Sequence, residues 1–231
     1  MKRVFGLLGV GLVVGVFLLI PGLARVSHAS TLFFDDFESG LSQWIGKNGG
    51  SHHGVIVPDP LQQGNNVLTF TGLNMAGDVF TAQSFTLQAG QHYRISFDYL
   101  GLATQGSVPD NLGGTAGMSE GLPGRHMWYY GTVNAGSTID VLVDDGQWHS
   151  YVYDFVAPVT AQFYGSGTFN VVHLMFEDWS GSGGVPGDAY FDNIRFESVT
   201  TTPAPVPEPS TLLLLGSGLA GLAGLRRRLK G

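Results

Sequence analysis

Short runs in which apolar and polar residues alternate fill the middle of this 231-residue chain. In Gln91–Tyr99, aromatic and branched residues occupy every second position, and Arg94, Ser96 and Asp98 occupy the positions between them. Trp148–Val156 repeats the pattern after a turn rich in aspartate and glycine. A period of two places one parity on the core side of a strand and the other on the solvent side. Both runs therefore predict half-buried β-strands.

Further strands are expected where apolar runs are bounded by Gly, Asn, Asp and Pro. Phe169–Phe176 is apolar on both parities, which is typical of a strand covered on both faces. The remaining candidate strands are Val67–Thr71, Val79–Leu87, His126–Val133, Ile139–Val143 and Ala189–Phe196. Leu102–Gly124 is rich in glycine and contains two prolines, so it is expected to be a long loop. Because helical periodicity is missing between the two ends of the chain, the pattern predicts an all-β, antiparallel sandwich.

The N-terminal 29 residues differ from this middle part. They begin with Met1-Lys2-Arg3, continue as an apolar run and end in Ser27-His28-Ala29. This order predicts a secretory signal peptide (1–29), which signal peptidase would remove during export by the secretion machinery. The alternative is a retained N-terminal anchor. One domain is then expected at 30–198, followed by a Ser/Thr/Pro-rich linker at 199–206.

Residues 207–231 form a second addressing segment. Pro207, Glu208 and Pro209 come first, followed by the apolar run Thr211–Leu225 and a basic C-terminus. Fifteen helical residues span roughly 22 Å at 1.5 Å per residue, which is short of the ~30 Å hydrocarbon core. We therefore expect a C-terminal transmembrane helix that crosses only if its arginines snorkel or the bilayer thins. The basic residues should stay in the cytoplasm.

The order of motif, apolar helix and basic cluster resembles the PEP-CTERM sorting signal of Gram-negative bacteria. The resemblance implies processing near Pro207-Glu208-Pro209 by exosortase, an integral-membrane cysteine transpeptidase. The protein would be anchored in the inner membrane first and would then reach the cell surface or the extracellular space. The alternative is an ordinary C-terminal anchor that no enzyme cleaves. The signal gives a destination and leaves the activity open.

The central domain is strongly acidic. Residues 30–206 contain four Lys and Arg residues against 17 Asp and Glu residues, a net charge of −13. Such a surface repels nucleic acid and anionic lipid, and it suits divalent cations, neutral glycans or simple solubility. The chain has no cysteine, so disulfides and thiol catalysis are excluded.

Four short segments of the domain resemble bacterial jelly-roll domains of the carbohydrate-binding-module and galactose-binding-like kind. They are Phe34–Gly40 with Trp44, Ala89–Phe97, Gly146–His149 and Tyr190–Ile194. The resemblance implies that the first and last strands lie side by side. It also implies that Trp44 and Trp148 belong to the core, and that a structural Ca²⁺ is held by Glu38 and Asp192.

Asp36 is close enough in sequence to serve as a further oxygen ligand, which Ca²⁺ requires. The alternative is that these acids face water or cap turns. Strict alternation places Asp192 on the same face as Ile194 and Phe196. Either a bulge in this last strand breaks the alternation, or the Asp192 carboxylate points inward and is paired with another group, which would favour a cation.

Aromatic residues provide the candidate ligand site. Sugar rings pack their C–H faces on Trp and Tyr, while charged and polar groups bind the hydroxyls. Trp128 and Tyr130, with Arg125 beside them, follow the glycine-rich segment, and Trp179 follows another candidate strand. Core packing is the alternative for both tryptophans. The expected partner is extracellular polysaccharide.

A polysaccharide-acting enzyme, such as a glycosidase or lyase, is the alternative function. It would need two carboxyl groups facing each other across the sugar, and the candidates are Glu177-Asp178, Asp144-Asp145 and Glu120. Neighbours such as Glu177 and Asp178 point to opposite faces of a strand. The sequence contains no Ser elbow, HExxH or phosphate loop. We therefore expect a non-enzymatic protein of the cell envelope or extracellular matrix.

Overall fold

The computed structural model describes residues 26–73, 78–108, 112–120, 130–134, 137–138, 140–157, 171–179, 184–202 and 209–228. They belong to two units. Ser27–Thr200 is a β-sandwich, and the helix α1 (Pro209–Arg228) belongs to the other unit.

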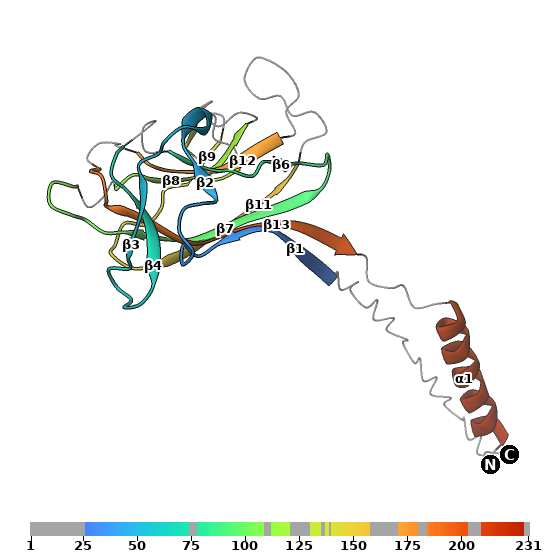
Figure 1. Ribbon diagram of the computed structural model, residues 1–231. Helices are drawn as coiled ribbons and strands as arrows, with labels where there is room; N and C mark the ends of the chain where they lie inside the picture. Colours follow the sequence, from blue (N-terminus) through green and yellow to red (C-terminus); the bar gives the residue numbers. More distant parts are fainter. Residues whose placement is uncertain are drawn as a thin grey trace, which may run out of the picture. The chain divides into compact units, whose positions relative to one another are not determined.

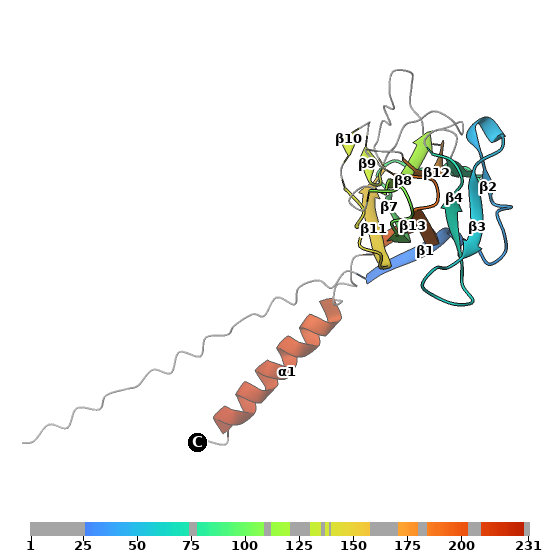
Figure 2. The same ribbon diagram turned by 90° about the vertical axis from the view of Figure 1, so that its left-hand side faces the viewer.

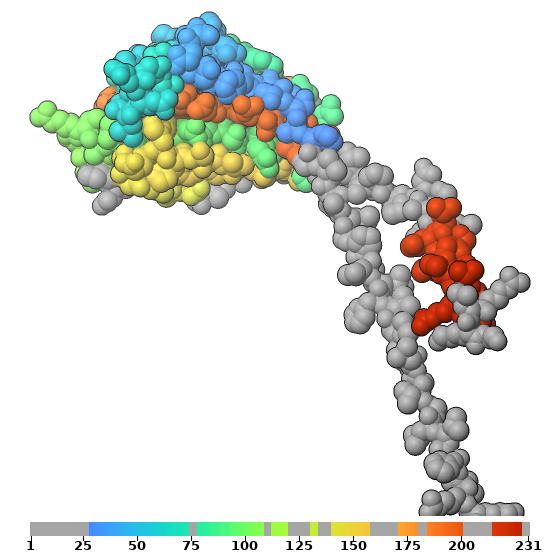
Figure 3. All heavy atoms as spheres, turned by 90° about the horizontal axis from the view of Figure 1, so that it is seen from below, coloured from blue at the N-terminus to red at the C-terminus, as the bar shows by residue number. Residues whose placement is uncertain are grey.

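In the described part of the chain, sheet A has six strands, and Figure 3 shows several of them side by side in different colours. Its order is β11 (His149–Val156), β7 (His92–Gly101), β13 (Ala189–Thr202), β4 (Asn66–Phe70) and β3 (Gly54–Pro58). β1 (Val26–Asp35) also pairs with β13. The first and last strands are therefore neighbours, as the jelly-roll resemblance implies.

Sheet B has five strands among the described residues. It forms the second layer, drawn above sheet A in Figure 1 and seen from the side in Figure 2. Its order is β2 (Trp44–Ile45), β5 (Val79–Thr81), β12 (Val171–Asp178) and β6 (Phe85–Thr86), with β8 (Gly114–Glu120) also on β12. The pairs of this sheet with known register are antiparallel. A hairpin, β9 (Val133–Asn134) with β10 (Ser137–Thr138), and the 3-10 turn η1 (Lys47–Gly49) complete the described elements. The predicted two-sheet antiparallel sandwich is confirmed.

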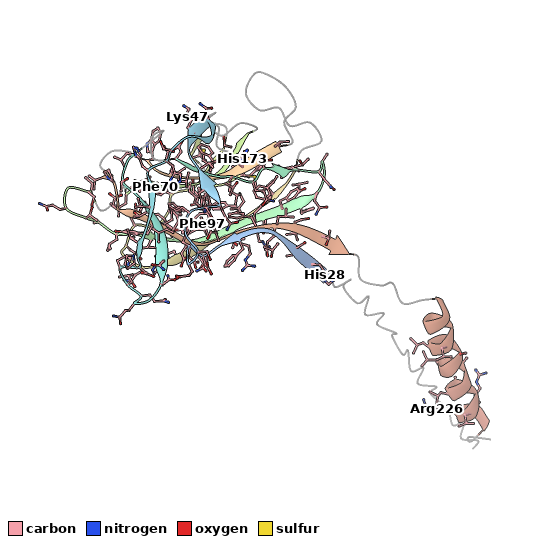
Figure 4. The ribbon with its side chains drawn as sticks, viewed as in Figure 1. His28, Lys47, Phe70, Phe97, His173 and Arg226 are labelled. Carbon is pink, nitrogen blue, oxygen red and sulfur yellow. The ribbon has the colours of Figure 1, made fainter. Side chains whose placement is uncertain are left out.

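The core between the sheets is largely aromatic. Phe97 from sheet A meets Phe176 of sheet B edge to face, with ring centroids 5.5 Å apart, and both rings are buried. Figure 4 shows Phe97 between the two layers. The alternate residues of β7 from Tyr93 to Tyr99 are all buried, as the period-two pattern predicts. Trp44 is also in the core, at 4 % exposure, whereas Trp148 is half-buried and donates its indole N–H to Asp59 (3.2 Å).

The prediction of a loop at Leu102–Gly124 is wrong for residues 114–120, which form β8. The strand carries no alternating pattern that the sequence could show, because residues 116–119 are all buried and include glycine and serine. The glycines of β8 are needed for close packing. A Cβ on Gly114 would collide with the Tyr99 ring, so only glycine lets the backbone approach it there.

Other predicted boundaries also differ. The single strand expected over Val79–Leu87 is split into β5 and β6, and residues 140–143 form no strand. β13 continues to Thr202, into the range expected to be linker, and the cleavage expected after Ala29 falls within β1. The first half of the predicted strand His126–Val133, residues 126–129, lies outside the described residues.

Candidate functional site

Among the described residues, the exposed tryptophan is Trp179, at the end of β12. Trp179 follows the last residue of the strand and is 49 % exposed. Its backbone is fixed by the segment before β8, because the Trp179 N–H donates to the carbonyl of Gly113 (2.8 Å). Gly113 has a φ of +82°, and a Cβ there would collide with the Trp179 carbonyl. A rigid backbone therefore holds an exposed indole.

Buried carboxyl groups lie next to this tryptophan. Asp178 and Asp188 are fully buried, and each has one oxygen, Oδ1, without a hydrogen-bond partner among the described residues. Asp188 Oδ2 accepts from the Val185 N–H (2.8 Å), and Asp178 Oδ2 accepts from the Gly187 N–H (3.3 Å). Burial raises the pKa of Asp178 to about 8, and the nearby Asp188 charge adds to the rise. Burial also raises the pKa of Asp188 to about 6.

A tyrosine–aspartate contact supports the same end of the sandwich. The Tyr99 hydroxyl donates to Asp144 Oδ1 (2.7 Å), and the Leu112 N–H donates to Asp144 Oδ2 (3.0 Å). Burial and the Asp144 charge raise the pKa of the Tyr99 hydroxyl. Asp144 thus ties β7 to the segment that holds Trp179.

Two of the carboxylates considered for a glycosidase, Asp144 and Asp178, lie near the same side chain, because the charges of both raise the pKa of the Tyr99 hydroxyl. Glu177 and Asp178 are successive residues of β12, and alternation places them on opposite faces, as expected. Asp145 is exposed and contacts His149 (2.8 Å). The side chain of Glu120 lies outside the described residues.

The structure describes only part of the other predicted aromatic site. Tyr130 is half-buried and stacks on Phe155, with ring centroids 4.0 Å apart and planes 7° apart. Its φ is +57°, and it lies in a bend. The expectation that it extends a strand from Trp128 is therefore wrong at Tyr130. Arg125 and Trp128 lie outside the described residues.

The residues expected to hold Ca²⁺ accept hydrogen bonds from the protein. Glu38 accepts from the backbone N–H (2.7 Å) and the side-chain amide (2.8 Å) of Asn66. Asp192 accepts from the Asn65 amide (3.0 Å), and Asp36 accepts from the Glu38 N–H (3.3 Å). No group of three or more His, Asp or Glu side chains placed to hold a metal occurs in the described part of the chain.

A bulge explains how Asp192 departs from strict alternation. The register of β13 against β7 shifts between Asp192 and Arg195, and Asn193 has a φ of +51°. Asp192 is 4 % exposed and Asn193 is exposed. Burial raises the pKa of Asp192, and the Asn65 amide opposes that rise. Of the two explanations offered from the sequence, the bulge is the one present, because Asp192 lies opposite Asp98, on the face of sheet A away from Phe191.

Calcium binding at Glu38 and Asp192 stays a prediction. An ion that binds only the folded state adds about 2.7 kcal/mol at a hundredfold excess over Kd, so EDTA is expected to lower Tm by about 5–10 °C. Glu38→Gln should remove this sensitivity, whereas the exposed Asp145→Gln should keep it. Melting curves that are identical with and without EDTA would contradict the calcium site.

The C-terminal segment is helical from Pro209 to Arg228. Proline fits this first helical turn because its missing N–H has no intrahelical partner there. Pro207 and Glu208 lie outside the described residues. Among the residues that the structure describes, no helix is long and apolar enough to cross a membrane, contrary to the expected transmembrane helix. α1 contains several glycines and ends in three arginines, which lower its mean hydropathy.

Comparison with known proteins identifies the C-terminal segment directly. Residues 205–228 match the PEP-CTERM protein-sorting motif. A search of curated proteins found no match.

Solved structures resemble the sandwich at low sequence identity. A structure described as "CBM4 structure and function" is 19 % identical, with 71 % of this chain and 92 % of that chain covered and a TM-score of 0.38. A Stig cyclase from Fischerella sp. TAU is 14 % identical, covering 80 % of this chain and 93 % of that one, with a TM-score of 0.40. The tailspike protein 4 domain of bacteriophage CBA120 is 13 % identical, with a TM-score of 0.39. The match covers 71 % of this chain and spans a fifth (20 %) of the length of that tailspike chain.

The described residues of the domain form an antiparallel two-sheet β-sandwich. The chain carries a PEP-CTERM motif at its C-terminus, which implies export and cell-surface sorting through exosortase.

Proposed function

We propose that the sandwich is a non-enzymatic glycan-binding domain that exosortase delivers to the cell surface or the extracellular polysaccharide. The observation that carries the proposal is the indole of Trp179, which is 49 % exposed on a backbone held by Gly113. A fixed, exposed indole can pack against the C–H face of a sugar with little loss of side-chain freedom. The domain charge of −13 favours neutral glycans over anionic ones.

Trp179→Ala is expected to weaken glycan binding about thirtyfold. An aromatic ring that is covered by the ligand in the complex contributes about 2 kcal/mol to the free energy of binding. Its Tm should change little, since half of the side chain already meets solvent. Binding is measured by pull-down on insoluble polysaccharides and by calorimetry with neutral oligosaccharides, and Tm on the same samples.

Phe34→Ala is the matched control. Phe34 is 39 % exposed and lies under the Arg195 guanidinium (4.7 Å), on a strand of sheet A. It should keep glycan affinity. Unchanged binding by Trp179→Ala would contradict the proposed surface, and release of reducing ends from the polysaccharide would favour the enzyme alternative.

A further inference from the structure

A lysine and an aspartate lie near each other at the edge of sheet B. β2 and β5 pair antiparallel with Ile45 opposite Phe80. Lys47 lies in the turn two residues after Ile45, and Asp78 lies just before β5, two residues before Phe80. The Lys47 ammonium is near the Asp78 carboxyl group, because its charge lowers the pKa of Asp78.

The next strand adds a glutamate to this row. β12 pairs with β5 at Met175 and Phe80, so Glu177 is opposite Asp78. Phe80 and Met175 form a small buried cluster, with Ile45 packed against it, separate from the core between the sheets. The row Lys47–Asp78–Glu177 therefore follows an apolar row on the outer face of sheet B. Lys47 is labelled on this side of the sandwich in Figure 4.

The two carboxyl groups are buried in contact with each other. Asp78 is 1 % exposed and Glu177 is fully buried. Burial raises the pKa of both, and the two side chains lie close enough for the Asp78 charge to raise the pKa of Glu177 further. The Lys47 ammonium lies close enough to lower the pKa of Asp78. Glu177 therefore keeps its proton at neutral pH and can act as an acid.

We propose that Lys47 and Asp78 are joined by an intramolecular amide bond, formed autocatalytically with Glu177 carrying the protons. The row supplies each part that this condensation needs: an amine, a carboxyl group and a proton carrier in a site from which water is largely excluded.

The reaction balances without any further reactant. The Lys47 ammonium first gives a proton to the carboxylate that the Asp78–Glu177 pair leaves ionised, which makes all three groups neutral. The Lys47 Nζ lone pair then attacks Asp78 Cγ, and a C–N bond forms. Glu177 accepts a proton from Nζ at one oxygen and donates its own from the other to the departing hydroxyl. The C–O bond breaks, one water leaves, and Glu177 ends protonated as it began.

The environment favours this product. Fixing the amine beside the carboxyl group replaces an encounter in solution with a high effective concentration. The bond also replaces an ammonium and a carboxylate, which are costly to bury, with a neutral amide. An exported domain without cysteine would gain a covalent link between two strands, the role that disulfides have in other exported proteins.

Peptide mass mapping of the full-length protein tests the proposal. Trypsin cuts after Lys and Arg, and Arg94 is the next such residue after Lys47. An amide on Nζ blocks cleavage at Lys47. We expect a peptide that runs uncut through Lys47 to Arg94 and is lighter than its sequence by one water, with fragment ions that locate the link between Lys47 and Asp78. Release of an unmodified 48–94 peptide would overturn the proposal.

Two variants separate the roles within the row. Lys47→Arg keeps the charge without the primary amine, so the water loss should disappear; its persistence would contradict a link at Lys47. Glu177→Gln keeps the size but cannot carry a proton, so it should release the ordinary 48–94 peptide. Glu197→Gln, on sheet A, should leave the link intact. A complete link in Glu177→Gln would overturn the role of Glu177, and the wild-type mass is decisive even if a variant fails to fold.

Discussion

Deletion of Thr211–Gly231 is expected to abolish cell-surface sorting in a host that carries exosortase. The PEP-CTERM motif covers residues 205–228, so the deletion removes the helix and the basic cluster while leaving the sandwich strands in place. The truncated protein should be released without processing. Glu208→Gln should instead accumulate as the unprocessed chain. Cell fractionation and intact mass spectrometry measure both results.

Glu197→Gln serves as the control for Glu208→Gln, because it makes the same change within β13 and outside the motif. It should be sorted normally. A wild-type mass that retains the whole tail would instead show a plain anchored protein and contradict exosortase processing.

The sandwich is also expected to lose stability as the pH rises from about 4 to about 8. In the unfolded chain, Asp178 ionises near pH 4, whereas burial raises its pKa to about 8 in the folded domain. Between these values the folded state holds a proton that the unfolded chain has lost. The free energy of unfolding therefore falls by about 1.4 kcal/mol per pH unit for this group. Asp188 adds to the fall up to about pH 6.

Urea unfolding between pH 5 and pH 8 measures this slope. Asp178→Asn should reduce it, while Glu177, on the other face of β12, keeps a contribution of its own. Asp145→Asn is the control, because Asp145 is exposed and its pKa is lowered by His149. A stability that is constant or rises over this range would contradict the protonated state of Asp178.

Much of the fold could be predicted because its strands carry large side chains. The rings of Tyr93, Phe97 and Tyr99 alternate with polar residues, and the one parity that they occupy is the buried one. β8 could not be found in this way, because residues 116–119 are buried on both parities and include glycine and serine, so large apolar side chains do not alternate with polar ones. Glycine is there for contact with Tyr99 in three dimensions, and the local sequence does not reveal that contact.

The sites were harder to predict because they depend on pairing between strands. Trp179 could be named as a candidate from its position after a strand, but its exposure depends on Gly113 and the fold around it. Lys47, Asp78 and Glu177 are far apart in sequence, and only the pairing of three strands brings them together. A Lys, Asp and Glu at such separations give no local signal.

The position of β13 decides how the domain resists mechanical load. The chain leaves the sandwich through this strand, which is hydrogen-bonded to β7 on one side and to β4 and β1 on the other. Tension applied through the C-terminus would act along an interior strand, so the hydrogen bonds on both of its sides would bear the force together in shear. An edge strand such as β11 could be peeled away one bond at a time. A domain held at a cell surface by its C-terminal end is thus loaded in its more resistant direction.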